Sequence, residues 1–123
     1  MNTIKSFRDL IVWQKAILLV KMTYPIIAKL PQTEKYCLYS QIQRCVVSIP
    51  SNIAEGYGRQ SKQDYIRFLH IAKGSLFEFQ TQLELSKELG YISESNCSEL
   101  TKLSNEVDKI LYAIIKKLSL QNT

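Results

Sequence analysis

The sequence predicts an all-α protein, and three observations support this prediction. Only four glycines and three prolines occur in 123 residues, which leaves little of the turn chemistry that an all-β fold needs. The chain is 46% hydrophobic and 22% charged, as folded globular domains are. Apolar residues recur at spacings of three and four over long stretches. We expect one domain, residues 1–123, with helices at about 6–29, 34–57, 62–89 and 94–119 in an up-down-up-down antiparallel four-helix bundle.

The first helix is expected to open at Ser6, which has Asp9 three residues later in the pattern of a capping box. Its apolar positions follow at spacings of four and three and predict one stripe: Trp13, Ile17, Val20, Tyr24 and Ile27. Pro25 falls inside this pattern and predicts a kink in the last turn, and Pro31 lies beyond the end of the helix.

The other three helices show the same periodicity. On the second, the face expected in the core carries Leu38, Ile42, Cys45, Ile49 and Ile53. On the third, which follows a capping pattern at Ser61–Asp64 and ends before Gly90, it carries Tyr65, Phe68, Ala72, Leu76 (or Ser75), Phe79, Leu83 and Ser86. On the fourth it carries Leu100, Leu103, Val107, Leu111, Ile114 and Leu118.

Helices one and three carry further apolar residues outside these stripes: Leu10, Ile11, Leu18, Ile66 and Phe77. A helix that is apolar on more than one face has more than one face to bury. We therefore expect the bundle to form a homo-oligomer.

Several classes of protein are not expected from this sequence. No uncharged apolar run approaches the roughly 20 residues that a membrane span needs, and charges inside the first apolar run argue against a signal peptide. Three cysteines, Cys37, Cys45 and Cys97, are odd in number and lack CxxC spacing. We expect reduced thiols that act as small hydrophobes, no metal site, and a cytoplasmic location.

The charge is positive overall and unevenly distributed. The net charge is +5, but residues 1–73 carry eleven Lys/Arg against four Asp/Glu, whereas residues 74–123 carry five against seven. This asymmetry suits an anionic partner, nucleic acid above all, although a solvated surface that keeps the protein soluble is an alternative.

Polar residues form a second stripe beside the apolar face of the second helix. This stripe contains Gln41, Arg44, Ser48, Asn52, Glu55 and Arg59, and the third helix carries Arg67, His70, Gly74 and Glu78 at similar spacing. Folding the two helices antiparallel pairs Arg44 with Glu78, Ser48 with Gly74, Asn52 with His70, and Glu55 with Arg67. We expect a polar ladder that sets the register of the two helices.

The stretch SIPSNIAEGYGRQ, residues 48–60, is predicted to be structural. Gly56 and Gly58 begin a GxG pattern, but Ser61 stands where a dinucleotide loop needs its third glycine and no strand precedes it. His70 is the only histidine, and Glu55 has no partner acid in view. We expect no catalytic residues, no cofactor and no enzymatic activity.

The nucleic-acid hypothesis has candidate residues. Aromatic and basic residues interleave from Tyr57 to Phe68, as they do in stacking platforms, but the helical phase places Tyr65 and Phe68 in the core. The candidates are therefore cations: Arg59, Lys62, Lys73, Lys15 and Lys21.

Four segments resemble one known family. Residues 7–16, FRDLIVWQKA, are similar to the FRDLxVWQKA opening of the four-helix bundle proteins encoded in intervening sequences of bacterial 23S ribosomal RNA genes. Residues 41–56 resemble the signature QxRRAxxSIPxNIAEG of that family, 68–76 its FLxIAxGSL segment, and 89–92 its LGYI. Two departures are Gln43 and Lys73, each at a position where the family commonly has arginine.

The resemblance implies a homopentameric ring of four-helix bundles with no known enzymatic activity. It also implies a relation to accessory proteins of diversity-generating retroelements, which form basic pentamers that bind nucleic acid and a reverse transcriptase. We therefore expect a non-enzymatic ring that binds nucleic acid, with RNA favoured. The alternative is a structural adaptor ring that docks a protein such as a reverse transcriptase.

Overall fold

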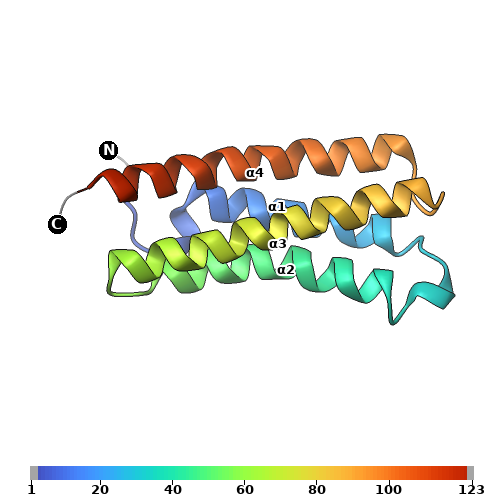
Figure 1. The fold of residues 1–123 in the computed structure, drawn as a ribbon, viewed down its shortest axis with the longest axis horizontal. Coiled ribbons are helices and arrows are strands. Elements are labelled where there is room, and N and C mark those ends of the chain that lie inside the picture. Colours follow the sequence, from blue (N-terminus) through green and yellow to red (C-terminus); the bar gives the residue numbers. More distant parts are fainter. Residues whose placement is uncertain (1–2, 122–123) are drawn as a thin grey trace.

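Four long helices make up most of the chain in the computed structural model, which describes residues 3–121 (Figure 1). They are α1 (Ile11–Ile27), α2 (Leu38–Tyr57), α3 (Lys62–Glu88) and α4 (Glu94–Leu120). Two 3-10 turns, η1 (Phe7–Asp9) and η2 (Gln32–Glu34), precede α1 and α2. Residues 3–121 contain no strand, so the prediction of an all-α chain with four helices is confirmed.

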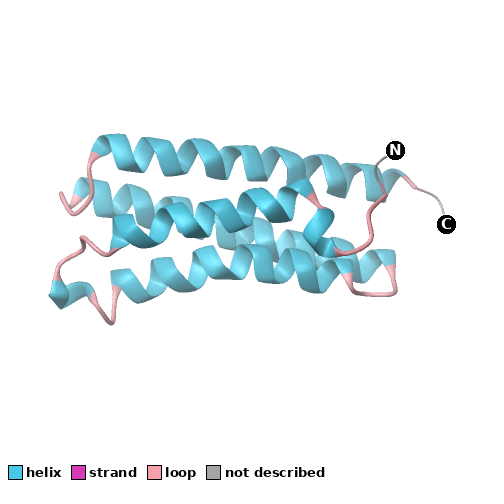
Figure 2. Ribbon diagram, turned by 180° about the vertical axis from the view of Figure 1, so that it is seen from behind, coloured by secondary structure: helices cyan, strands magenta, loops and turns pink. Residues whose placement is uncertain are grey.

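The helices neighbour one another in the cyclic order α1, α2, α3, α4. The α2–α3 turn lies at the same end of the molecule as η1 and the last turns of α4, and we call this the turn end (Figures 1 and 2). The connections from α1 to α2 and from α3 to α4 lie at the opposite end, the loop end. In this order the α1–α2 seam and the α3–α4 seam are on opposite sides of the molecule.

The helix ends follow the predicted capping patterns closely. The predicted capping box at Ser6 is present, but it caps the start of η1. Helix α1 itself begins later, at Ile11. The Ser61 hydroxyl accepts a hydrogen bond from the Asp64 amide at 3.0 Å, which caps α3. Gly90 follows the last turn of α3 with a φ of 79°, a conformation that glycine adopts without a steric penalty.

The second helix begins later than predicted, at Leu38 instead of residue 34. Gln32–Glu34 forms η2, and the backbone of Cys37 has φ −118° and ψ −100°, which is not helical. The Glu34 carboxylate accepts a hydrogen bond from the Leu38 amide at 3.3 Å. Its position just before the first helical turn suits the positive end of the helix dipole.

The core stripes of α2, α3 and α4 are confirmed. All five predicted residues of α2 are buried, as are six of the seven on α3, where Tyr65 is half-buried. On α4 the first four are buried, and Ile114 and Leu118 are half-buried at the turn end.

The predicted stripe of α1 is corrected by about one residue. The buried side chains are Val12, Ala16, Leu19, Thr23, Ile26 and Ile27. Most of the predicted stripe lies one position further along, where Trp13, Ile17 and Val20 are half-buried and Tyr24 is exposed. One residue rotates a helix by about 100°, so this set faces the edge of the bundle beside α2. Both sets repeat at the same spacing, and periodicity alone did not separate them.

Candidate nucleic-acid interface

Two of the five predicted binding cations are used to join helices. The Lys15 ammonium lies 2.9 Å from the Glu106 carboxylate and links α1 to α4. The Lys73 ammonium lies 2.8 Å from the Asp108 carboxylate and links α3 to α4, with both side chains largely buried. Their charges are offset inside the monomer, so these two lysines are poor candidates for an external anion. Lys21 is exposed ten residues along α1 from its start, about 15 Å from the turn end.

Arg59 and Lys62 lie together at the turn end. The Arg59 guanidinium donates to the Glu55 carboxylate at 2.8 Å, and it also lies 4.7 Å from the centre of the Phe68 ring. The Lys62 ammonium donates to the carbonyl oxygen of Gln121, which joins the α2–α3 turn to the end of α4. Arg59 is therefore held by groups from α2 and α3, and Lys62 by the end of α4.

Two further arginines lie near this end and are also held against aromatic rings. The Arg67 guanidinium lies 4.6 Å from the centre of the Phe68 ring and 3.5 Å from the Asp64 carboxylate. The Arg8 guanidinium lies 4.5 Å from the centre of the Phe7 ring in η1. Stacking on a ring restricts an arginine side chain but leaves N–H groups free to donate.

Seven cations lie on the segments that meet at the turn end, and together we call them the basic end: Lys5, Arg8, Arg59, Lys62, Arg67, Lys116 and Lys117. They come from residues 3–10, 55–68 and 114–121, where the acids are Asp9, Glu55 and Asp64. The loop end differs, because residues 28–38 and 84–95 carry three lysines and four glutamates. The two ends of the bundle thus differ in charge, and the turn end is the positive one.

Sequence reasoning found only part of the basic end. The sequence predicts Arg59 and Lys62 as binding residues and places Arg67 in the polar ladder, but it does not single out Lys5, Arg8, Lys116 or Lys117. A usable signal existed, because in an antiparallel bundle the start of α1, the α2–α3 turn and the end of α4 share one end.

The predicted polar ladder forms only in part and in a shifted register. Ser48 is hydrogen-bonded to Ser75 at 2.8 Å between their hydroxyl oxygens, so the partner of Ser48 is the residue after Gly74. Asn52 donates from its amide to the carbonyl oxygen and the hydroxyl of Ser48, at 2.8 and 2.9 Å. Gly74 and His70 are exposed, which follows from the rotation of about 100° that one residue produces.

The ends of the ladder also differ from the prediction. Glu55 pairs with Arg59 one turn later on α2, and Arg67 pairs with Asp64 one turn earlier on α3. Arg44 and Glu78 are exposed, and within residues 3–121 no ion pair joins them. Partners within one helix replace partners across the seam, because they meet without any requirement on register.

The glycine-containing stretch has the structural role that was expected, with one change. Gly56 lies inside α2 and is buried; a Cβ there would come within 2.7 Å of the Phe68 Cβ. It therefore allows α2 and α3 to approach closely, whereas Gly74 has open space around it. Gly58 follows α2 with a φ of −80°, a value that other residues also adopt.

The cysteines and acids form no cluster suited to a metal. Across the described residues, no group of three or more His, Cys, Asp or Glu side chains is placed to hold an ion. Cys45 and Cys97 are buried and Cys37 is exposed. Burial raises the pKa of the Cys45 thiol to about 11, and the neighbouring Glu78 carboxylate contributes in the same direction. In the part of the chain that the structure describes, no helix is apolar enough over a sufficient length to cross a membrane.

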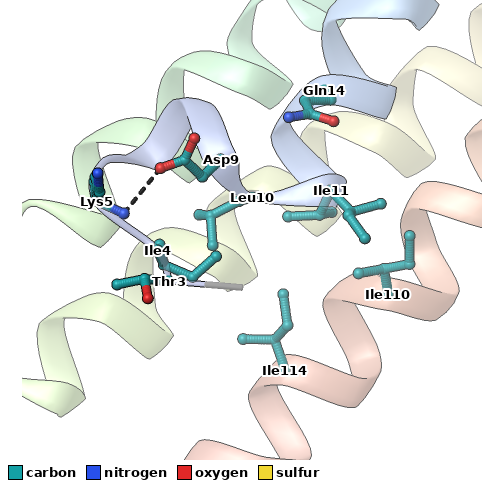
Figure 3. Close-up of a pocket in the computed structure, with 10 residues that line it drawn as sticks. Thr3, Ile4, Lys5, Asp9, Leu10, Ile11, Gln14, Ile110 and Ile114 are labelled. Carbon is teal, nitrogen blue, oxygen red and sulfur yellow. Dashed lines mark hydrogen bonds between the residues drawn. The ribbon is translucent and has the colours of Figure 1, made fainter. Parts of the chain in front are cut away.

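An open cleft of about 760 Å³ lies next to the basic end, between the segment before α1 and the face of α4 (Figure 3). Its floor is apolar, from Leu10, Ile11, Ile110 and Ile114. At its rim the Asp9 carboxylate accepts a hydrogen bond from the Lys5 amide at 2.8 Å, drawn as a dashed line in Figure 3. This bond fixes the segment that carries Lys5, so the cleft contributes to the shape of the basic end.

Comparisons with known proteins agree on one family. A family model described as "23S rRNA-intervening sequence protein" matches residues 8–113. A crystal structure of a protein of unknown function from the S23 ribosomal protein family of Bacteroides thetaiotaomicron has a TM-score of 0.78 and 29% sequence identity, covering 86% of this chain and 99% of that one. A search of curated proteins gave no match. Since the family match covers most of the chain, as the resemblance in its first three helices predicted, the protein belongs to the 23S rRNA-intervening sequence protein family.

Proposed function

We propose that this protein is a non-enzymatic, cytoplasmic up-down-up-down bundle that assembles into a homo-oligomeric ring, a pentamer by family resemblance, and binds nucleic acid through its basic end. The observation that carries the proposal is the gathering of seven Lys and Arg side chains at the turn end against three acids. RNA is favoured, because the family name connects these proteins with 23S rRNA.

The basic end has a net positive charge because its seven cations outnumber its three acids, and each acid already has a partner. Glu55 pairs with Arg59, Asp64 pairs with Arg67, and Asp9 accepts hydrogen bonds from two backbone amides. A phosphate that approaches this end therefore meets cations and few competing acceptors. Contacts between such cations and phosphates provide affinity without sequence specificity.

Assembly would multiply this effect. A ring whose copies point the same way presents several basic ends on one surface, and a single polymer that reaches two of them binds more tightly than to one. A modest cluster on each copy can then give useful affinity. A monomer with the same cluster would bind weakly and release readily.

The test is a salt series of binding to a single-stranded RNA, for the unaltered protein and for Arg59→Ala/Lys62→Ala. Binding should weaken linearly with the logarithm of salt concentration, because bound cations release counterions from the polymer. Loss of two phosphate contacts should reduce this slope by about 1.4, at about 0.7 per contact for a single strand.

A matched control removes the same charge elsewhere. Lys29→Ala/Lys35→Ala acts at the loop end, where both side chains are exposed, and should leave the slope unchanged. Absence of binding to RNA and DNA at low ionic strength, or binding that does not depend on salt, would refute the nucleic-acid proposal.

The second candidate function is the adaptor ring that docks a protein such as a reverse transcriptase. It is favoured by the apolar side chains that α1 and α3 leave exposed, among them Ile11, Leu18 and Phe77 at 63%, 45% and 48% exposure. Purified reverse transcriptase retained by the protein after nuclease treatment would support this candidate. If nuclease treatment abolishes retention of the reverse transcriptase, nucleic acid bridges the two proteins, and the nucleic-acid proposal is favoured.

A further inference from the structure

A groove with apolar walls runs along the seam between α1 and α2. The α1–α2 groove has a volume of about 300 Å³ and is lined by Trp13, Ile17, Val20, Val47, Pro50, Ser51 and Ala54. Val47 is 38% exposed, and the three residues from α1 are half-buried. These α1 residues form most of the stripe that periodicity predicted for the core, so here the helix has a second apolar face.

A second apolar surface lies on the opposite side, at the seam between α3 and α4. Phe77, Leu85 and Tyr112 are 48%, 47% and 59% exposed. Phe77 and Tyr112 lie on either side of the Lys73 ammonium, each ring centre 5.6 Å away from it. The rest of this α3–α4 face surrounds a shallow hollow and consists of Gln80, Thr81, Glu84, Glu88 and Thr101.

The two surfaces carry opposite charge. Beside the α1–α2 groove stand Lys21, one position after Val20, and Arg44, one turn before Val47; both are exposed and neither forms an ion pair within residues 3–121. The α3–α4 face contains Glu84 and Glu88, whose carboxylates share one cation, the Lys87 ammonium, at 2.6 and 3.8 Å. The groove is thus bordered by cations, and the face has surplus negative charge.

A contact between two different surfaces on opposite sides of a molecule has a defined consequence. Each copy that uses its face leaves its groove open for another copy, so the contact repeats and either closes into a ring or continues as a filament. A two-fold dimer would need one patch that complements itself, but two patches of like charge repel.

We propose that the α3–α4 face of one copy of this chain packs against the α1–α2 groove of the next, with Glu84 and Glu88 opposite Lys21 and Arg44. The occupant of the groove is a second copy, because opposite charge and exposed apolar side chains are both present on the same molecule. This inference rests on the self-assembly in the proposed function and adds the two surfaces that make it.

Charge reversal tests the pairing directly. Lys21→Glu/Arg44→Glu makes the groove acidic, and Glu84→Lys/Glu88→Lys makes the face basic. Each double variant should raise the dissociation constant for assembly at least tenfold, measured by light scattering over a dilution series, because like charges now face each other. The quadruple variant combines both reversals, restores opposite signs, and should recover the mass of the unaltered protein.

Controls separate this proposal from the proposed function. Lys29→Glu/Lys109→Glu changes the charge by the same amount at exposed sites outside both surfaces and should assemble normally, and circular dichroism verifies that every variant is folded. Full assembly of both double variants, or failure of the quadruple variant to recover, would overturn the assignment of the two surfaces while leaving the ring intact. A monomeric unaltered protein at micromolar concentration would instead contradict the self-assembly itself.

Discussion

Helix α2 forms two seams that are built in contrasting ways. Its seam with α3 is closed by small and polar residues: Gly56 lies against Phe68, and the Ser48 and Ser75 hydroxyls are hydrogen-bonded at 2.8 Å. Its seam with α1 is lined by apolar residues yet remains open as a groove that reaches Val47. The comparison teaches that apolar content alone does not close a seam. Close approach of the backbones closes the first, and the second has apolar surface left for another molecule.

The largest expected effect comes from filling the closed seam at Gly56. A Cβ at this position would lie 2.7 Å from the Phe68 Cβ and 3.2 Å from the Tyr65 ring, so a side chain has to push α2 and α3 apart. Gly56→Leu should lower the free energy of unfolding by about 3 kcal/mol or more, and Gly56→Ala by about 1–3 kcal/mol, as overpacking does. Urea denaturation followed by circular dichroism measures both.

The matched control for this prediction is Gly74, a glycine within α3 that is exposed. A Cβ at Gly74 meets nothing within 4 Å, so Gly74→Ala should raise stability by about 0.5–1 kcal/mol through helix propensity alone. Equal losses at the two glycines would show that close approach at Gly56 does not distinguish the α2–α3 seam.

The fold was predictable where the pattern allowed one solution. On α2 polar residues flank the predicted stripe on its α3 side, and all five predicted core positions are buried. On α1 the apolar residues cover more than half of the helix, and two stripes one residue apart fit the same spacing. Packing against α2 and α4 decides which of the two stripes is buried, and periodicity carries no information about that packing.

The candidate site was predictable only where local sequence determines it. Arg59 and Lys62 lie at the turn between α2 and α3, so their place at one end of the bundle could be predicted from the position of that turn. The partners of Lys15 and Lys73 were not predictable, because the acids that they meet on α4, Glu106 and Asp108, are 91 and 35 residues away. Which lysine meets which carboxylate depends on the rotation of each helix, and an error of one residue in register changes every partner.

An intermediate effect is expected at the hydroxyl pair of the closed seam. Ser48→Ala and Ser75→Ala each remove one partner of a half-buried hydrogen bond and should cost about 1 kcal/mol, as single hydrogen bonds do. The double variant should cost less than the sum, because both changes remove the same hydrogen bond and that bond is lost only once. A double-mutant cycle from urea denaturation gives this coupling, and strictly additive losses would mean that the pair contributes nothing specific.

A smaller effect is expected in the open seam. Val47→Ala removes methyl groups that are partly in water, so the free energy of unfolding of the monomer should change by less than about 0.5 kcal/mol. The same change at Ile49, which is fully buried two residues later, should cost about 2–5 kcal/mol. Equal losses at Val47 and Ile49 under conditions where the protein is monomeric would show that the groove is closed within one copy.

The smallest effect at neutral pH concerns Cys45 in the closed seam. Burial raises the pKa of its thiol from the usual 9.0 to about 11, so at pH 7 the folded and unfolded chains both retain the proton and stability is unaffected. Between about pH 9 and pH 11 the unfolded chain releases this proton while the folded chain keeps it, and stability must fall as pH rises. The decline should be shallower in Cys45→Ala, because all other ionisable groups are common to the two proteins and their contribution cancels on subtraction. Urea midpoints at pH 7, 9, 10 and 11 measure the difference. Parallel curves for the two proteins would show that the Cys45 thiol contacts water and that the α2–α3 seam is open to solvent at this position.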